Sequence, residues 1–185
     1  GKVLLKLGGS NVLGETIKRA LTFSDEIIVC TSKEAIDDKI SDFCYHNKTR
    51  CYRGDLENVF SRYRNILIDK QYSEYNWFAR ITADNPLISE KLALYLKQNI
   101  KENLDYISYA DQEVVLGSGI ELINKKSFLG IDESKLDEYE KEHVTPKLFE
   151  NRNFYNCKFL KSPLNNYSPK IRLTLDYLED YYLLK

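Results

Sequence analysis

The sequence predicts a three-layer α/β fold built on a mainly parallel sheet, and three observations support this prediction. Short apolar segments alternate with amphipathic helical patterns along most of the 185 residues. Several of the apolar segments end in glycine or in a polar residue, where an open α/β sheet places its ligands. No repeat, linker or low-complexity tract divides the chain. Because such strand–helix alternation is typical of α/β proteins, we expect a single domain over residues 1–185.

The expected strands are short apolar runs bounded by turn or polar residues. They cover residues 3–5, 26–30, 51–52, 77–83, 106–109, 121–123 and 171–175. In the segment 26–30 the four residues after Glu26 are continuously apolar, which is typical of a strand buried on both faces. The segment 77–83 is the clearest strand. Asn85 and Pro86 follow it closely and stop it, because proline cannot extend a hydrogen-bonded ladder.

The expected helices have apolar residues spaced three or four positions apart. They cover about 13–21, 36–44, 59–67, 89–100 and 137–142, with another helix beginning near 145 and a short one after 176. This spacing places the apolar side chains of each helix on one face, which then packs on the sheet.

Composition excludes several classes of protein. Apolar residues make up 43% of the chain, charged residues 30%, and the net charge is −1, whereas nucleic-acid binders typically have a basic face. No apolar stretch is long enough to span a bilayer, and the opening Lys/Leu pattern is not that of a signal peptide. The four cysteines lack metal-binding spacing. We therefore expect a cytoplasmic protein with reduced thiols, no zinc, and no membrane or nucleic-acid partner.

Two aspartates are candidate metal ligands. Asp84 follows the expected strand 77–83, and Asp176 follows 171–175. Ligands of open α/β sheets bind at the carboxyl ends of the strands, and carboxylates meeting there can share a Mg²⁺ ion. Each aspartate on its own is equally well explained as a turn residue or a helix N-cap.

Two further segments combine a turn with a possible nucleotide contact. Thr31 and Ser32 follow a strand and open a helix, and Glu34 completes a capping-box pattern with Thr31. The free N–H groups of such a helix start can also bind a phosphate. Gly8-Gly9 either lets the backbone approach a ligand or makes a simple turn.

Three polar residues lie elsewhere in the predicted elements. Arg53 and Asp55 follow a strand, where a surface turn explains them as well as a ligand does. Arg80 lies inside a strand that we expect to be buried, so it needs a carboxylate or a ligand as its partner.

His143 precedes a helix that begins with Thr145 as N-cap and Pro146 in the first turn. A single histidine of this kind is more often structural than catalytic.

Several motifs together resemble one family of enzymes. They are Gly1-Lys2-Val3-Leu4-Leu5-Lys6-Leu7-Gly8-Gly9, Thr31-Ser32, Arg53-Gly54-Asp55, Arg80-Ile81-Thr82-Ala83-Asp84-Asn85-Pro86-Leu87, Glu142-His143-Val144-Thr145-Pro146 and Arg172-Leu173-Thr174-Leu175-Asp176. In this order they resemble the spore-coat polysaccharide cytidylyltransferases, relatives of the CMP-sialic acid and CMP-Kdo synthetases. The resemblance covers essentially the whole chain.

The resemblance implies a fold, a reaction and a set of site residues. The fold is that of nucleotide-diphospho-sugar transferases, a Rossmann-like mixed sheet flanked by helices. A sugar hydroxyl attacks the α-phosphorus of CTP, pyrophosphate leaves, and Mg²⁺ and basic side chains stabilise the developing charge. The resemblance also implies that a first strand and an Arg-containing signature loop precede Gly1, and that relatives commonly form homodimers.

The matched motifs place the residues of this chain in named roles. Asp84 and Asp176 hold Mg²⁺ and, with Lys2 along the triphosphate, carry catalysis. The nucleotide is bound by Lys2, Gly8, Gly9, Thr31, Ser32, Arg53, Asp55 and Arg80, and the sugar by Glu121 and His143.

Two other functions remain open from the residues alone. A glycosyltransferase that uses a nucleotide-sugar can have the same kind of fold, but it usually holds its metal on a DxD motif, which Asp84-Asn85-Pro86 is not. A non-catalytic homologue that binds a nucleotide is the second alternative.

Overall fold

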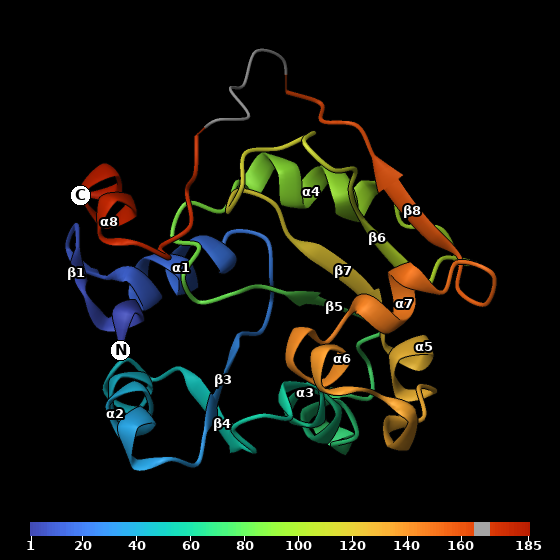
Figure 1. Ribbon diagram of the computed structural model, residues 1–185, viewed down its shortest axis with the longest axis horizontal. Helices are drawn as coiled ribbons and strands as arrows, with labels where there is room; N and C mark the ends of the chain where they lie inside the picture. Colours follow the sequence, from blue (N-terminus) through green and yellow to red (C-terminus); the bar gives the residue numbers. More distant parts are fainter. Residues whose placement is uncertain (165–170) are drawn as a thin grey trace.

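The computed structural model describes residues 1–164 and 171–185, and its centre is a four-stranded sheet (Figure 1). The strand order is β5 (Trp77–Arg80), β7 (Glu121–Asn124), β6 (Tyr106–Tyr109) and β8 (Cys157–Leu160). β7 runs antiparallel to both of its neighbours, whereas β6 and β8 are parallel. The sheet is therefore mixed, which confirms the fold that the family resemblance implies, whereas the mainly parallel sheet expected from strand–helix alternation alone is wrong. The connection from β6 to β7 contains no helix, so the chain turns back beside β6.

Two smaller units lie beside this sheet. β3 (Ile28–Ser32) and β4 (Arg50–Gly54) pair in parallel, and α2 (Asp38–His46) connects them. β1 (Lys6–Leu7) and β2 (Ser10–Asn11) form a short antiparallel hairpin that leads into α1 (Val12–Ala20).

The remaining helices lie where the sequence predicts a helix, except α5, which was not predicted. They are α3 (Val59–Leu67), α4 (Glu90–Gln98), α5 (Lys125–Leu129), α6 (Glu138–His143), α7 (Pro146–Glu150) and α8 (Leu178–Leu184). Asparagine or serine side chains begin three of the longer helices: Asn11, Asn58 and Ser89 each accept a hydrogen bond from an N–H of the first turn. These caps satisfy N–H groups that the helix leaves unpaired.

Helices cover both faces of the central sheet, which gives the predicted three layers. Ile107 and Leu122 pack with α4 in one apolar cluster. Tyr106 and Ile123, their chain neighbours, pack with α3, α5 and α7 in a second cluster. Because side chains alternate across a strand, each strand contributes to both clusters. Figure 1 shows α4 on one side of the sheet and α3, α5 and α6 on the other.

The two ends of the described chain lie together. Leu7 and Val12 pack with Leu175 in a third apolar cluster that Tyr181 of α8 joins. The Tyr181 hydroxyl donates to the Lys6 carbonyl at 2.7 Å, and Figure 1 shows α8 beside β1. Among the described residues, no helix is both long and apolar enough to cross a membrane.

Two of the predicted strands are wrong. Residues 3–5 fall mostly in a 3₁₀-helix, Lys2–Leu4, whose three residues include no buried side chain. Among the described residues, the segment 171–175 forms only one bridge, between Arg172 and Leu116. Leu173 N–H donates to the Leu116 carbonyl, and Leu175 N–H donates to the Asp84 carbonyl. Because these two acceptors lie on different loops, the segment does not follow one partner strand.

Gly117 allows the segment 171–175 to approach the loop after β6. Its φ is +90°, and a Cβ atom there would lie 2.7 Å from the Leu173 carbonyl carbon. We expect Gly117→Ala to lower the free energy of unfolding by about 2 kcal/mol or more, because both the positive φ and the clash oppose a side chain. Chemical denaturation measures this loss. Gly9→Ala is the control, because its Cβ would meet nothing within 4 Å, and an equal loss in both variants would contradict the prediction.

Candidate active site

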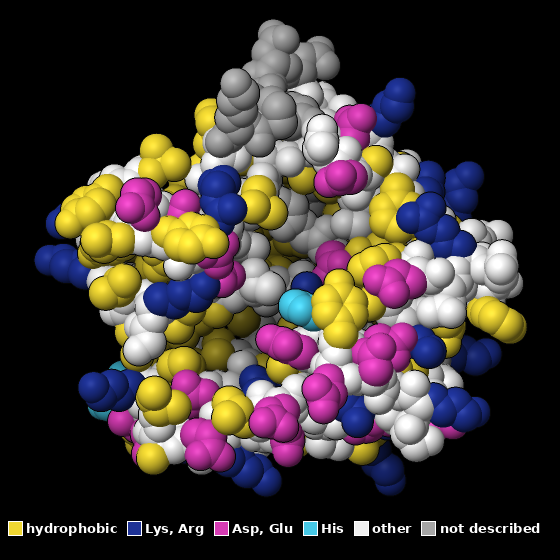
Figure 2. Space-filling model, viewed as in Figure 1, with side chains coloured by type: hydrophobic (Ala, Val, Ile, Leu, Met, Phe, Trp, Pro, Cys, Tyr) yellow, Lys and Arg dark blue, Asp and Glu magenta, His cyan; other side chains and the backbone are white. Residues whose placement is uncertain are grey.

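A large cavity opens between β3 and β5, with a volume of about 820 Å³. Its walls are mainly apolar and include Leu13, Ile17, Phe23, Ile28, Val59, Trp77 and Phe78. Its polar lining includes Arg80, Asp84, Glu142, His143 and Asp176. Figure 2 shows a hollow in this face, with apolar side chains on its floor and charged side chains around it. The cavity therefore combines an apolar body with the candidate catalytic carboxylates.

The two predicted metal ligands are brought together with Lys2. The Lys2 Nζ atom lies 2.8 Å from Asp84 Oδ2 and 3.0 Å from Asp176 Oδ1. Leu175 N–H donates to the Asp84 carbonyl at 2.9 Å, so the backbones beside the two carboxylates are joined directly. Asp84 does not follow its strand immediately, since β5 ends at Arg80. The pair predicted from the sequence is thus close in space, through a backbone contact between two loops.

Asp176 is held by residues of its own segment. Arg172 Nη2 lies 2.7 Å from Asp176 Oδ2, and Arg172 Nε lies 3.4 Å from Asp180 Oδ1. The N–H groups of Asp176 and Tyr177 both donate to Asp180 Oδ2 at 2.9 Å. The backbone N–H groups of Tyr177 and Asp176, together with Arg172, lower the pKa of Asp180. Asp180 therefore remains a carboxylate and fixes the start of α8 beside Asp176.

These contacts fit a divalent cation. One oxygen of each aspartate contacts the same ammonium group, so the two carboxylates converge on a single position that already carries positive charge. Carboxylate oxygens are the donors that hard divalent cations prefer. Asp84 and Asp176 would hold such an ion, and substrate phosphates would complete its ligands.

Arg80 has a carboxylate partner, as its burial required. Its Nη1 atom donates to Glu121 Oε2 at 2.8 Å, and the two side chains are 20% and 19% exposed. The other Glu121 oxygen, Oε1, accepts hydrogen bonds from the Tyr106 hydroxyl at 2.5 Å and the Thr145 hydroxyl at 3.0 Å. Both oxygens of Glu121 are thus bonded to protein donors. This network joins β5, β6, β7 and the start of α7 beneath the cavity.

His143 lies at the cavity wall, at the end of α6. Its side chain is exposed, and its ring centroid lies 4.4 Å from that of Tyr139. Thr145, the residue expected to cap the next helix with its hydroxyl, makes no such cap and instead bonds Glu121.

The two glycines near the chain start form a tight turn. Gly8 and Gly9 connect β1 to β2, and Gly8 has a φ of +56°. Short hairpins favour glycine where φ is positive. Neither glycine belongs to the described lining of the cavity.

The predicted site residues around β3 and β4 bond mainly to one another. Asp37 Oδ2 accepts from both the N–H group of Ser32, at 3.1 Å, and its hydroxyl, at 2.6 Å. Burial acts to raise the pKa of Asp37, but hydrogen bonds from Ser32 and Thr31 outweigh it and lower that pKa. The capping box expected between Thr31 and Glu34 does not form, because the Ser32 hydroxyl instead accepts from Glu34 N–H at 3.1 Å.

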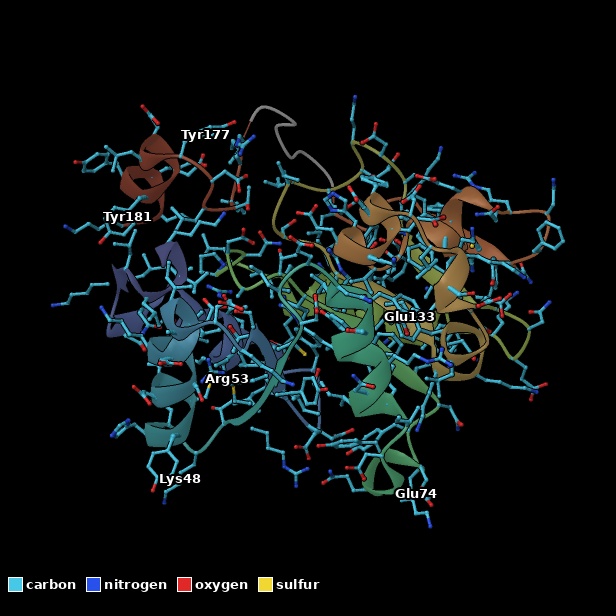
Figure 3. The ribbon with its side chains drawn as sticks, turned by 60° about the horizontal axis from the view of Figure 1, so that its bottom comes forward. Lys48, Arg53, Glu74, Glu133, Tyr177 and Tyr181 are labelled. Carbon is cyan, nitrogen blue, oxygen red and sulfur yellow. The ribbon has the colours of Figure 1, made fainter. Side chains whose placement is uncertain are left out.

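Arg53 and Asp55 also make local contacts. Arg53 donates to the carbonyls of Ser32 and Glu34 at 3.0 Å and pairs with Asp38 at 2.7 Å. Asp55 accepts hydrogen bonds from backbone N–H groups at the start of α3. Figure 3 shows Arg53 beside α2, in a different part of the molecule from Tyr177. The structure therefore does not bring these residues to the carboxylate pair.

Two residues that support Asp176 were not singled out as site residues from the sequence. Arg172 and Asp180 contact Asp176 from either side. Each lies four residues from Asp176 in the sequence. That spacing suits a cation–carboxylate pair for Arg172, and an acidic residue such as Asp180 is common at a helix start, so these two patterns could have indicated both residues.

The sequence model of the cytidylyltransferase family matches residues 1–183. The chain belongs to this family. It is therefore a nucleotidyltransferase, as the motifs predicted. It is 33% identical over 186 residues to the uncharacterized protein MJ1063 of Methanocaldococcus jannaschii, covering 98% of this chain and 74% of that protein. It is 27% identical over 193 residues to the spore coat polysaccharide biosynthesis protein SpsF of Bacillus subtilis, covering 100% of this chain and 78% of that protein.

Solved structures confirm the fold of this cytidylyltransferase. A cytidylyltransferase from Leptospira borgpetersenii matches with a TM-score of 0.85 and 26% identity, over 98% of this chain and 76% of that one. More distant structures share the fold alone. They include CMP:2-keto-3-deoxy-manno-octonic acid synthetase complexed with CTP (TM-score 0.58, 14% identity, 88% and 83% covered) and a manganese complex of Rv0371c from Mycobacterium tuberculosis (TM-score 0.66, 14% identity, 99% and 90% covered).

Proposed function

We propose that this cytidylyltransferase transfers CMP from CTP to a hydroxyl group of a sugar, with release of pyrophosphate, in the synthesis of a surface polysaccharide or glycan. The observation that carries the proposal is the convergence of Asp84 and Asp176 on one cationic position at the wall of a large cavity. The name of the Bacillus subtilis relative supports polysaccharide synthesis, and the CTP complex of a protein with the same fold supports the nucleotide.

Charge stabilisation is the main task of the site residues. As the sugar oxygen attacks and pyrophosphate leaves, negative charge spreads over the phosphate oxygens. A divalent cation, which we propose to be Mg²⁺, supplies Lewis-acid stabilisation when bound. Asp84 and Asp176 hold its position, Arg172 orients Asp176, and Lys2 places a further positive charge beside them. The manganese complex of the distant structural relative supports a divalent ion in this fold.

The structure supports the other predicted ligand contacts to different degrees. His143 lines the same cavity as the carboxylates, which supports a contact with the sugar. The hydrogen bond that Arg80 donates to Glu121 favours a role for both residues in holding the cavity wall. The nucleotide contacts of Gly8, Gly9, Thr31, Ser32, Arg53 and Asp55 stay predictions.

We further propose that the first strand implied by the family resemblance fills the apolar body of the cavity. Among the described residues, β3 pairs only with β4 and β5 pairs only with β7, so each strand has one edge without a ladder partner. Residues of both strands line the cavity together with apolar side chains of α1 and α3. A strand between β3 and β5 would join the two sheets and bury this apolar surface. The strand that the family resemblance implies before Gly1 would fit this position.

Trp77 reports on this strand because it is the only tryptophan of residues 1–185 and it lines the cavity. In the protein expressed from the start codon of its gene, we expect its fluorescence emission at shorter wavelength than in the chain of residues 1–185. The added strand would exclude water from the indole ring. Equal emission maxima in the two proteins, both shown to be folded by circular dichroism, would contradict the proposal.

Pyrophosphate release tests the function directly. The protein expressed from its start codon is incubated with Mg²⁺, each of the four NTPs and a panel of acidic and neutral sugars. We expect release with CTP and one class of sugar, and little with the other nucleotides. Release with another nucleotide would identify that nucleotide as the donor in place of CTP. CTP binding without release from any sugar would favour the non-catalytic or glycosyltransferase alternative, and absence of CTP binding would reject the nucleotide assignment.

A further inference from the structure

The turn between α6 and α7 has a backbone conformation that side chains rarely adopt. Val144 has φ 73° and ψ −48°, and Thr145 N–H donates to the His143 carbonyl at 2.8 Å. These features define the γ-turn with positive φ, which is rare and strained. The other described non-glycine residues with positive φ, Lys48 and Gln112, are exposed, whereas Val144 is completely buried. Strain of this kind costs on the order of 1–3 kcal/mol and persists only where the surroundings enforce it.

Two sets of contacts hold this turn in place. The Val144 side chain is part of the second apolar cluster, with Phe60 and Leu148. The Thr145 side chain is 2% exposed, and its hydroxyl donates to Glu121 across 24 positions of sequence. Helix capping does not account for this threonine, because its hydroxyl makes no bond to the first turn of α7.

The strained turn lies directly between this anchor and a cavity residue. His143 is the last residue of α6 and lines the cavity that contains Asp84 and Asp176. Its carbonyl closes the γ-turn, while its ring packs on Tyr139 of the same helix. The position of the imidazole therefore depends on the Thr145 hydroxyl bond two residues away.

We propose that Val144 and Thr145 are positioning residues for His143. The γ-turn, anchored through Thr145 to the Glu121–Arg80 pair, holds the imidazole at the part of the cavity where the acceptor sugar binds. There a ring nitrogen forms a hydrogen bond to a sugar hydroxyl. The identity of the ligand rests on the proposed function, but the positioning of His143 does not.

NMR spectroscopy of the imidazole groups tests the positioning without any substrate. The chain has two histidines, His143 and His46, so each variant yields two sets of ring signals, and His46→Asn assigns them. Thr145→Val keeps the side-chain shape but removes the donor to Glu121, whereas Thr145→Ser keeps the donor. We expect Thr145→Val to change the ring-current shift that Tyr139 imposes on His143, with His46 unmoved. Thr145→Ser keeps the wild-type positions.

The opposite results would overturn the proposal. These are unmoved His143 signals in Thr145→Val, or an equal displacement in Thr145→Ser. Thr145→Ala repeats the test if the valine variant does not fold.

Kinetics provide the second measurement, with the sugar that supports pyrophosphate release. Losing a hydrogen bond of about 1.4 kcal/mol corresponds to tenfold in binding. We therefore expect Thr145→Val to raise KM for the sugar about tenfold, with KM for CTP unchanged and with Thr145→Ser restoring the sugar KM. An equal rise in KM for the sugar and KM for CTP would show that Thr145 has only a general structural role. If no sugar supports release, the proposed function fails while the NMR result still decides the positioning.

Discussion

We expect Asp176→Asn to reduce pyrophosphate release from CTP by at least about a hundredfold, and Asp84→Asn to do the same. Each substitution keeps the size of the side chain but removes one of the two negative charges that converge on the Lys2 ammonium. Removing a single group that stabilises developing charge typically costs 10²–10³ in kcat. Because both carboxylates serve one cation, the double variant should be little worse than either single variant.

The measurement is the initial rate of pyrophosphate release at saturating CTP and sugar. Asp132→Asn is the matched control, since Asp132 is an exposed aspartate paired with Lys135 at 3.1 Å and does not line the cavity. Its rate should remain within about twofold of wild type, as expected for a surface pair. Retention of a third or more of the wild-type rate in Asp176→Asn would exclude this carboxylate from catalysis.

Lys2→Met has opposite effects on metal binding and on catalysis. The ammonium group contacts the two oxygens that a divalent cation would use, so Lys2 and the cation compete for one position. Lys2 is partly exposed, and such ion pairs contribute about 1 kcal/mol at most. We therefore expect the variant to bind Mn²⁺ about fivefold more tightly without nucleotide. With CTP and sugar, kcat/KM falls by about a hundredfold, because the positive charge for the triphosphate is lost.

Mn²⁺ binding is measured by electron paramagnetic resonance or calorimetry, and catalysis by pyrophosphate release. Lys6→Met makes the same change in net charge nearby in the sequence. Neither measurement should change, because among the described residues the exposed Lys6 forms no ion pair with Asp84 or Asp176. Weaker Mn²⁺ binding in Lys2→Met would contradict competition between the ammonium and the cation. Tighter binding in both variants would show only an effect of net charge.

Local sequence patterns determined the elements whose stabilising contacts are also local. The helices α3 and α4 begin where the apolar spacing predicts, because Asn58 and Ser89 cap their own first turns. The core strands β6 and β7 also match, since their residues are apolar on both faces of the sheet. Asp84 and Asp176 were identified through strand ends and family motifs, which are properties of short segments.

Tertiary contacts decided the rest. Asp84 and Asp176 meet because Leu175 N–H bonds the Asp84 carbonyl, and the segment before Asp176 is not a strand at all. The Thr145 hydroxyl bonds Glu121 in β7 in preference to its own helix. In each case the hydrogen-bond partner lies far away in the sequence, and sequence spacing describes only local partners. The sequence alone therefore determined the family, most of the elements and the carboxylate pair, whereas the folded chain chose the partner of each polar group, because only packing sets which distant acceptor lies within reach.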